Sequence, residues 1–294
     1  MPELPDVALY LEHLATRVLH QPLVNLTIRS PFVLRSVNPP VSDAVGKRVV
    51  GLRRMGKRIV LALEGELFLV IHLMIAGRLK WSPLGKKAGG KLVLAVLEFP
   101  GGLLFLTEAG TKRRASIHLV SGEAALRQFE RGGLEVLESD LASFTQRLTS
   151  ENHTLKRALT DPRLFSGIGN AYSDEILHQA RLSPLTLTRR LGEAEIDRLY
   201  RATRATLEQW IVRLRDQAGE KFPEKVTAFR EEMAVHGRYS LPCPDCGTPV
   251  QRIRYADNET NYCARCQTGG RLLADRAMSR LLKQDWPRSI DEVE

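Results

Sequence analysis

Two Cys-x-x-Cys pairs close to the C-terminus constrain the fold of this chain more than any other feature. Sixteen residues separate the pairs, which hold all four cysteines of the sequence: Cys243, Cys246, Cys263 and Cys266. In a reducing compartment, thiols grouped in this way bind a metal rather than form disulfides. The separation matches tetrahedral Zn²⁺ coordination by four thiolates, which leaves no position for a catalytic water. The sequence therefore predicts one structural zinc ion.

The residues between the two pairs are typical of a β-hairpin. We expect VQRIRYA and ETNYC to form two antiparallel strands that turn at Asp257 and Asn258. Arg252 and Arg254 lie on this hairpin. One interpretation is a zinc ribbon that holds basic side chains against a phosphate backbone. The alternative is a zinc staple that only stabilises the C-terminal part of the chain.

Upstream of the cysteines, the chain begins with one helix and continues as strands. Residues 5–20 have helical periodicity, with Pro5 in the first turn and Asp6 near the positive end of the helix dipole. Short apolar runs separated by Gly, Pro and Lys then extend to about residue 120. This pattern predicts a β-sandwich or barrel with the helix laid against it.

The following hundred residues are predicted to be helical. We expect helices near 124–130, 139–149, 153–160, 170–180, 192–199 and 200–217. Residues 219–242 have poor periodicity and are predicted to be a long connection, and Leu272–Leu282 a short helix. The expected class is an α+β multidomain fold. Its predicted domains are a β-sandwich domain (1–122), a helical domain (123–235), a zinc finger (236–270) and a C-terminal tail (271–294).

The net charge of +9 and a pI near 9.6 favour a polyanionic partner, because each lysine or arginine placed against a phosphate releases counterions. No stretch approaches the roughly 20 apolar residues of a membrane span. The first ten residues, MPELPDVALY, lack the basic and apolar regions of a signal peptide. We expect a cytoplasmic protein that does not bind membranes.

The N-terminus offers a candidate nucleophile. Once Met1 is removed, Pro2 carries a secondary amine that can attack a sugar aldehyde carbon and form an iminium directly. An α-amino group has a reference pKa near 8, so a neutral fraction exists at physiological pH. The adjacent Glu3 could carry protons to and from the sugar or the leaving group.

Three separated segments together resemble one family, the formamidopyrimidine-DNA glycosylase/endonuclease VIII family of DNA repair enzymes. MPELPDV at residues 1–7 is similar to its N-terminal catalytic motif, and LFSGIGNAYSDE at 164–175 to its helix–two-turn–helix signature. The cysteine pairs lie where the family carries its zinc finger. The resemblance covers roughly residues 1–270, so it implies the family's fold throughout: helix plus β-sandwich, helix–two-turn–helix domain and zinc finger.

The resemblance implies a bifunctional DNA glycosylase/AP lyase of base excision repair that acts as a monomer on double-stranded DNA with damaged bases or abasic sites, in the bacterial nucleoid. By this resemblance Pro2 is the Schiff-base nucleophile and Glu3 the general acid/base, while Lys57 and Asn170 bind phosphates beside the damaged nucleotide. The damaged base is expected to leave the stack and enter a pocket in a cleft between the two large domains. Lys156 is a further candidate for DNA contact. Asn170 is also a candidate N-cap of its helix.

The chain departs from the family pattern mainly where the family recognises its lesion. Asp6 stands where a glutamate is usual, and either Met74 or Ile75 could fill the gap that a flipped base leaves. The family's strand-probing Arg and Phe have no clear equivalents in residues 107–114, and Asn258 replaces a phosphate-binding arginine at the hairpin tip. Residues 219–242 do not resemble the lesion-capping loop of 8-oxoguanine enzymes.

These departures predict a non-standard lesion preference: oxidised pyrimidines, ring-opened purines or abasic sites. Opposite-base preference and the type of elimination are left open by the sequence. An alternative function is a catalytically inactive protein on the same fold that binds damaged DNA.

Overall fold

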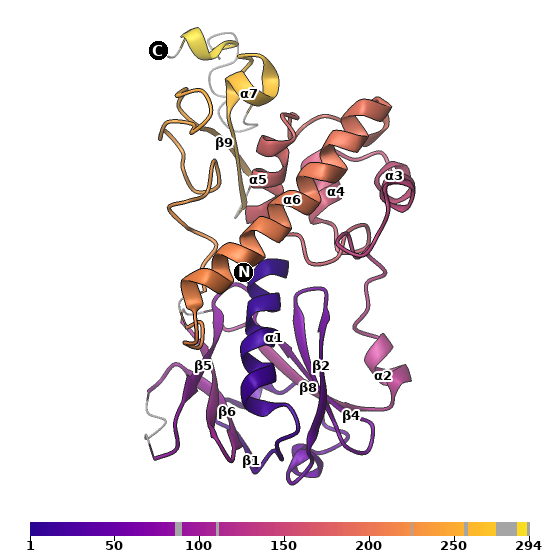
Figure 1. The fold of residues 1–294 in the computed structure, drawn as a ribbon, viewed down its shortest axis with the longest axis vertical. Coiled ribbons are helices and arrows are strands. Elements are labelled where there is room, and N and C mark those ends of the chain that lie inside the picture. The colour runs from indigo at the N-terminus through magenta and orange to yellow at the C-terminus, as the bar shows by residue number, and fades with distance from the viewer. Residues whose placement is uncertain (86–89, 110–111, 225, 256–257, 275–286, 293–294) are drawn as a thin grey trace. The chain divides into compact units, whose positions relative to one another are not determined.

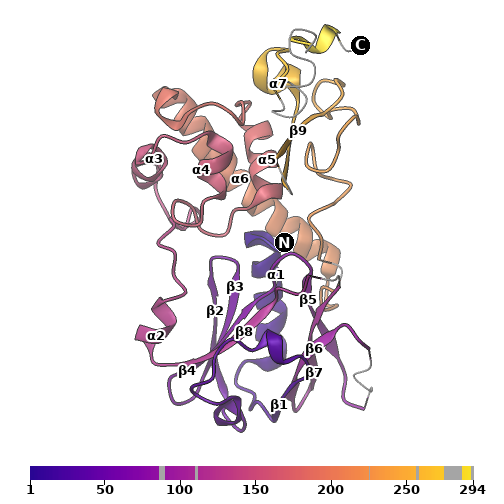
Figure 2. The same ribbon diagram turned by 180° about the vertical axis from the view of Figure 1, so that it is seen from behind.

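The structure is a computed structural model, which describes residues 1–294 except 86–89, 110–111, 225, 256–257, 275–286 and 293–294 (Figures 1 and 2). Its internal contacts divide the chain into two compact units. The N-terminal unit comprises residues 1–131 and 210–227, and the C-terminal unit comprises residues 132–209 and 228–294.

The N-terminal unit is a helix laid on a sandwich of two four-stranded antiparallel sheets, with strand orders β1-β6-β7-β5 and β2-β3-β4-β8. Its helices are α1 (Leu4–Val18) and α2 (Glu123–Arg127), with short 3₁₀ turns at Pro31–Val33 and Val41–Ala44. Its strands are β1 (Asn25–Ile28), β2 (Val49–Met55), β3 (Arg58–Leu63), β4 (Leu67–His72), β5 (Gly77–Ser82), β6 (Val93–Phe99), β7 (Gly102–Glu108) and β8 (Ser116–Ser121). The predicted helix-plus-sandwich fold is confirmed.

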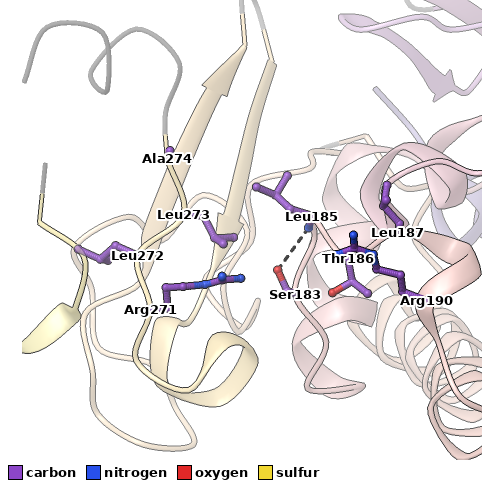
Figure 3. Close-up of a pocket in the computed structure, with 9 residues that line it drawn as sticks. All are labelled: Ser183, Leu185, Thr186, Leu187, Arg190, Arg271, Leu272, Leu273 and Ala274. Atoms are coloured by element: carbon purple, nitrogen blue, oxygen red, sulfur yellow. Dashed lines mark hydrogen bonds between the residues drawn. The ribbon is translucent and has the colours of Figure 1, made fainter. Parts of the chain in front are cut away.

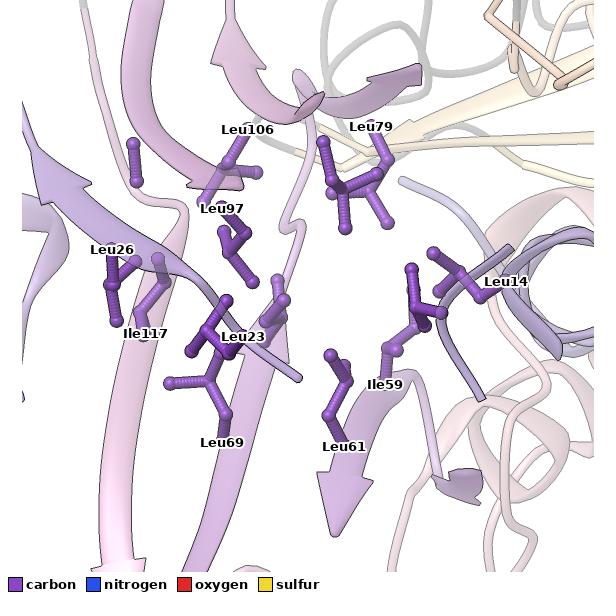
Figure 4. Packing of buried hydrophobic residues seen from close by; sticks show 14 of the residues in the cluster. Leu14, Leu23, Leu26, Ile59, Leu61, Leu69, Leu79, Leu97, Leu106 and Ile117 are labelled. Atoms are coloured by element: carbon purple, nitrogen blue, oxygen red, sulfur yellow. The ribbon is translucent and has the colours of Figure 1, made fainter. Parts of the chain in front are cut away.

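The main core lies between the two sheets and α1 (Figure 4). Successive side chains of a strand point to opposite faces, so β3 sends Ile59 and Leu61 into this core while Val60 points the other way. Val60 joins a second apolar cluster with Phe68 and Leu126, a residue of α2. Because β3 and β4 are buried on both faces, their sequences are continuous apolar runs instead of alternating patterns.

Part of the long predicted connection packs into the same unit. Phe222 lies with its ring centroid 5.8 Å from that of Tyr10 and 6.1 Å from that of His13, both on α1. Val226 is buried in the main core. Among the described residues of 219–242 there is neither helix nor strand, as the poor periodicity predicted, yet the segment contributes apolar side chains to the core.

The C-terminal unit combines helices with a two-stranded hairpin. Its elements are α3 (Leu141–Thr149), α4 (Leu155–Thr160), α5 (Asn170–Gln179), the first part of α6 (Glu193–Ala218), β9 (Gln251–Tyr255), β10 (Asn258–Tyr262) and α7 (Ala264–Thr268), with 3₁₀ turns at Thr188–Arg190 and Ile290–Glu292. The predicted antiparallel hairpin is confirmed, with Thr260 opposite Ile253. The helices predicted near 192–199 and 200–217 are instead one 26-residue helix, because residues 193–218 contain neither Gly nor Pro.

The C-terminal tail returns to the hairpin. Leu272, Leu273 and Ile290 pack on Ile253 and Tyr262 in one cluster, and the Leu273 N–H donates to the Tyr262 hydroxyl at 2.8 Å. The helix predicted at Leu272–Leu282 does not include Leu272 or Leu273, and its residues from 275 onward lie outside the described part of the chain. No helix within the described ranges is long and apolar enough to cross a membrane.

Candidate active site and metal centre

Pro2 and Glu3 are buried at the entry to α1. The Glu3 N–H donates to the Asp6 carboxylate at 2.9 Å, and the two residues form a reciprocal capping box around the first turn. Such a box satisfies two backbone donors that a helix start would otherwise leave unpaired. The short Asp6 side chain therefore has a structural use, which is to fix the backbone of Glu3 next to Pro2.

The charged groups around the amino terminus come from the start of α1, from the turn between β2 and β3, and from β5. Burial lowers the pKa of the Met1 amino group, and Arg78 and Lys57 lower it further, whereas Glu3 and Asp6 raise it. Lys57 belongs to the Gly56–Lys57 turn between β2 and β3, where Gly56 has a φ of +61°. Sequence reasoning proposed Lys57 but missed Arg78, which follows Gly77 at the start of β5.

Met74 and Ile75, the two candidates for filling the gap left by a flipped base, both lie in the turn between β4 and β5 but differ in exposure. Met74 is half-buried and has a φ of +53°, a left-handed conformation that costs a non-glycine residue on the order of 1 kcal/mol. Ile75 is 60% exposed at the tip. The Arg78 guanidinium donates to the carbonyls of Ile75 at 3.1 Å and Gly77 at 2.6 Å, and these two hydrogen bonds stabilise the turn.

A second group of basic side chains, also missed by sequence reasoning, surrounds His72. Register places Arg58 opposite His72 on adjacent strands. Burial lowers the pKa of His72 to about 4, with Arg58, Lys57 and His118 acting in the same direction. The imidazole is therefore neutral at physiological pH, and it can donate one hydrogen bond to an anion held by the cations around it.

A buried carboxylate at the end of β7 anchors the segment that leads to β8. Glu108 is 1% exposed, and its oxygens accept the N–H groups of Arg114 at 2.9 and 3.0 Å and of Ala115 at 3.1 Å. Residues 110–111 lie outside the described part. Glu108 thus fixes the backbone at Arg114 and Ala115, and the preceding Lys112 and Arg113 are both exposed.

In the C-terminal unit, the GIGN segment leads into α5. The N-cap residue is Gly169, and Asn170 is the first helical residue, so the prediction that Asn170 is the N-cap is wrong by one position. The physical reason is that the Asn170 amide is used elsewhere: its Nδ2 donates to the carbonyl of Glu259 on β10 at 2.8 Å. Asn170 thereby ties the start of α5 to the hairpin.

Lys156 lies in a buried polar network on α4 and α5. Its side chain is only 12% exposed, and its ammonium donates to the Asp174 carboxylate at 2.5 Å and to the Asn170 carbonyl at 2.7 Å. The other Asp174 oxygen lies 2.8 Å from His236 Nδ1. An ion pair this well surrounded orients the groups it touches, so Lys156 positions the first turn of α5.

The sulfur atoms of the four cysteines, two from before β9 and two from after β10, lie close together. All four Sγ atoms lie within 4.8 Å of one another, with Cys243–Cys266 at 3.9 Å and Cys246–Cys263 at 3.4 Å. Tetrahedral zinc with Zn–S bonds near 2.3 Å requires sulfur atoms roughly 3.8 Å apart. The cluster therefore fits one structural Zn²⁺, as the spacing predicted.

Replacement of one buried ligand is expected to empty this centre. Cys263→Ala removes a thiolate at a side chain that is 0% exposed, and three ligands bind structural zinc far more weakly than four. We expect stoichiometric zinc in the purified wild-type protein and less than a tenth of that in the variant, measured by elemental analysis. Zinc retained at full stoichiometry by Cys263→Ala would contradict a four-thiolate site.

The hairpin carries the remaining candidates. Arg252 lies over the Tyr239 ring at 3.9 Å, and both Arg252 and Arg254 approach the Glu259 carboxylate at 3.5 Å. Arg254 is exposed. Asn258 begins β10, but its side chain lies outside the described residues.

A pocket of about 460 Å³ lies between the helical part of this unit and the tail (Figure 3). Leu185 and Leu187 line it from the helical part, Leu272 and Leu273 line it from the tail, and Arg190 and Arg271 are also among its lining residues. No predicted site residue lines it.

Comparison with known families gives three matches in chain order. Residues 1–117 match the formamidopyrimidine-DNA glycosylase N-terminal domain, residues 133–219 its H2TH domain, and residues 240–269 the zinc finger found in FPG and IleRS.

Individual relatives match along the whole chain. A formamidopyrimidine-DNA glycosylase of Thermus thermophilus is 35% identical over 281 residues, which cover 92% of this chain and 100% of that protein. The crystal structure of the MutM (Fpg) protein from the same species superposes with a TM-score of 0.76 at 34% identity, covering 90% of this chain and 98% of that one. Lactococcus lactis Fpg in complex with DNA containing an abasic site shares the fold, with a TM-score of 0.79 at 23% identity over 90% and 99% of the two chains. This chain therefore belongs to the formamidopyrimidine-DNA glycosylase family of DNA repair enzymes.

Proposed function

We propose that this family member is a bifunctional DNA glycosylase/AP lyase that uses the amine of Pro2 as its nucleophile. The observation that carries the proposal is the buried start of α1, where the capping box holds Glu3 beside Pro2. Lys57 and Arg78 both act on the Met1 amino group at this place, and we expect the Pro2 amine to meet the same two cations once Met1 is removed. The neutral form of that secondary amine is the nucleophile.

The proposed chemistry has two stages. The Pro2 nitrogen attacks C1′ as the bond to the damaged base breaks, and Glu3 delivers the proton that the departing base takes up. Opening of the sugar gives an iminium between Pro2 and C1′. This cation acidifies C2′, so loss of a C2′ proton expels the 3′-phosphate and cuts the strand.

Binding of the duplex is proposed to use cations and amides of both units. Lys57 is proposed to bind a phosphate beside the damaged nucleotide, with the neutral His72 as a neighbouring donor. In the C-terminal unit, Asn170 and the hairpin arginines Arg252 and Arg254 are the proposed phosphate contacts. Lys156 is proposed to act mainly through Asn170, whose carbonyl it holds.

Ile75 is proposed to fill the gap left when the damaged nucleotide leaves the stack, because it is exposed at the tip of a braced turn. Apolar side chains inserted between base steps hold a duplex in this opened state. Ile75→Gly is expected to weaken binding to abasic-site duplex about tenfold, measured by fluorescence anisotropy. Its unfolding free energy should change little, since the side chain is exposed.

Val50→Ala is the matched control for Ile75, because Val50 is an apolar residue of the same unit and is 51% exposed. It should bind like the wild type. Equal binding by Ile75→Gly and wild type would reject Ile75 as the inserted residue.

The lesion preference is proposed to be non-standard. The segment anchored by Glu108 has lysine and arginine side chains where the family carries its opposite-strand probes, and Phe222 and Val226 pack into the core of the N-terminal unit. Oxidised pyrimidines, ring-opened purines and abasic sites are the proposed substrates.

The test is borohydride trapping of the Met1-processed, zinc-replete protein on duplexes with an abasic site, a ring-opened purine, an oxidised pyrimidine or 8-oxoguanine. Borohydride reduces an iminium to a stable amine, so a covalent protein–DNA band supports the lyase mechanism and its intensity ranks the lesions. Absence of a band on every duplex would favour the inactive damage-binding protein.

A further inference from the structure

One face of α5 is a polar contact surface for the zinc finger. Asn170, Asp174 and His178 recur every four residues, which aligns them along one side of a helix. Asn170 donates to the Glu259 carbonyl on β10 at 2.8 Å, and Asp174 lies 2.8 Å from His236 Nδ1. His178 approaches the metal centre itself, at the C-terminal end of the helix.

Glu175 fastens the chain that enters the finger to the same helix. Its carboxylate accepts three successive backbone N–H groups, from Ala234 at 2.7 Å and from Val235 and His236 at 2.9 Å. Seven residues further on, the chain supplies Cys243, the first thiolate of the zinc centre. The position of this ligand therefore depends on α5.

The contact between His178 and Cys243 has a defined polarity once zinc is bound. The Nε2 atom of His178 lies 3.2 Å from the Cys243 sulfur, and both side chains are buried. A zinc-bound thiolate has no proton and can only accept, so the imidazole N–H must be the donor. Four thiolates around Zn²⁺ leave a formal double negative charge, which a buried donor stabilises.

We propose that His178 is an outer-shell donor to the Cys243 thiolate that sets how tightly the centre retains zinc and couples zinc occupancy to α5. The coupling is reciprocal, as all coupling between binding events is. A zinc ion that holds Cys243 in place supports His178, and α5 in turn holds Glu259 through Asn170. This role is independent of the glycosylase chemistry and concerns the stability of the finger.

The test measures zinc release from the full-length protein into excess chromogenic chelator. His178→Phe keeps a planar ring of similar size but has no donor, and its release rate should rise about tenfold or more, the scale on which outer-shell partners act. His178→Gln places an amide N–H near the original Nε2 position, and its release should stay within a few-fold of the wild-type rate. Equal release rates for His178→Phe and wild type would overturn the proposal.

Two further measurements separate donation from other roles of the ring. His153→Phe is the matched control, because that imidazole lies in the same unit and bonds Glu151 at 2.6 Å rather than a cysteine; it should release zinc at the wild-type rate. The absorption spectrum of the Co²⁺-substituted wild type should be that of four sulfur ligands. A spectrum of three sulfurs and one nitrogen would make His178 a ligand and overturn the proposal. Zinc release from His178→Gln as fast as from His178→Phe would also overturn it.

Discussion

A residue retained in front of Pro2 is expected to abolish borohydride trapping of this protein on abasic-site DNA. The proline nitrogen is then a tertiary amide, whose lone pair is delocalised into the carbonyl and cannot attack C1′. We expect the covalent band to fall at least a thousandfold, to the background of the assay, with the extended and processed proteins compared at equal concentration and equal zinc content.

A second variant separates loss of the nucleophile from loss of the fold. Pro2→Gly leaves a primary amine that lacks the ring and is more flexible, so trapping should be weaker than in the wild type but stronger than in the extended form. All three proteins should bind abasic-site duplex within a few-fold of one another. An extended protein that still traps DNA efficiently would rule out Pro2 and direct attention to a lysine.

The zinc finger could be predicted from sequence because its chemistry is local. The ligands occur as two pairs, and the two cysteines of each pair lie three positions apart in the sequence. This spacing is typical of a four-thiolate zinc site. The β-sandwich was predictable for a related reason, since short apolar runs between turn residues are typical of strands. The double-sided burial of β3 and β4 needed the tertiary arrangement, because a continuous apolar run does not say what covers each face.

The surroundings of the candidate site were less predictable. Arg78 and His72 lie near the candidate residues only because β4 pairs with β3 and β5 with β7, and strand register is not visible in a single sequence. The contacts that one face of α5 makes with the zinc finger were equally hidden in the sequence. The sequence did not predict that the Asn170 amide contacts β10, nearly ninety residues further along the chain.

Asp6 stands where the family usually has a glutamate, and the structure shows that the shorter side chain still caps the first turn of α1. One methylene shorter than the usual glutamate, its carboxylate still accepts the Glu3 N–H at 2.9 Å. The substitution is therefore compatible with a fixed Glu3 at the first turn of α1.

Glu3→Gln is accordingly expected to separate the two proposed activities. The amide has nearly the same shape and can still accept a hydrogen bond in the capping box, but it cannot deliver a proton. Excision of an intact damaged base should fall by about 10² to 10⁴, the usual contribution of general acid catalysis. Trapping on a duplex with a pre-formed abasic site should fall much less, because no base has to leave. Single-turnover rates on both duplexes measure the ratio.

Glu12→Gln is the matched control, since Glu12 lies on the same helix and pairs with Arg215 at 2.7 Å on the surface. It should leave both rates unchanged, because an exposed ion pair contributes little to stability. If Glu3→Gln slowed excision and trapping by the same factor, Glu3 would act on the sugar or the amine, not on the leaving base. The proton for the base would then have to come from water or from a group near Arg78. That result would reject Glu3 as the proton donor to the base but would leave the proposed role of Pro2 unchanged.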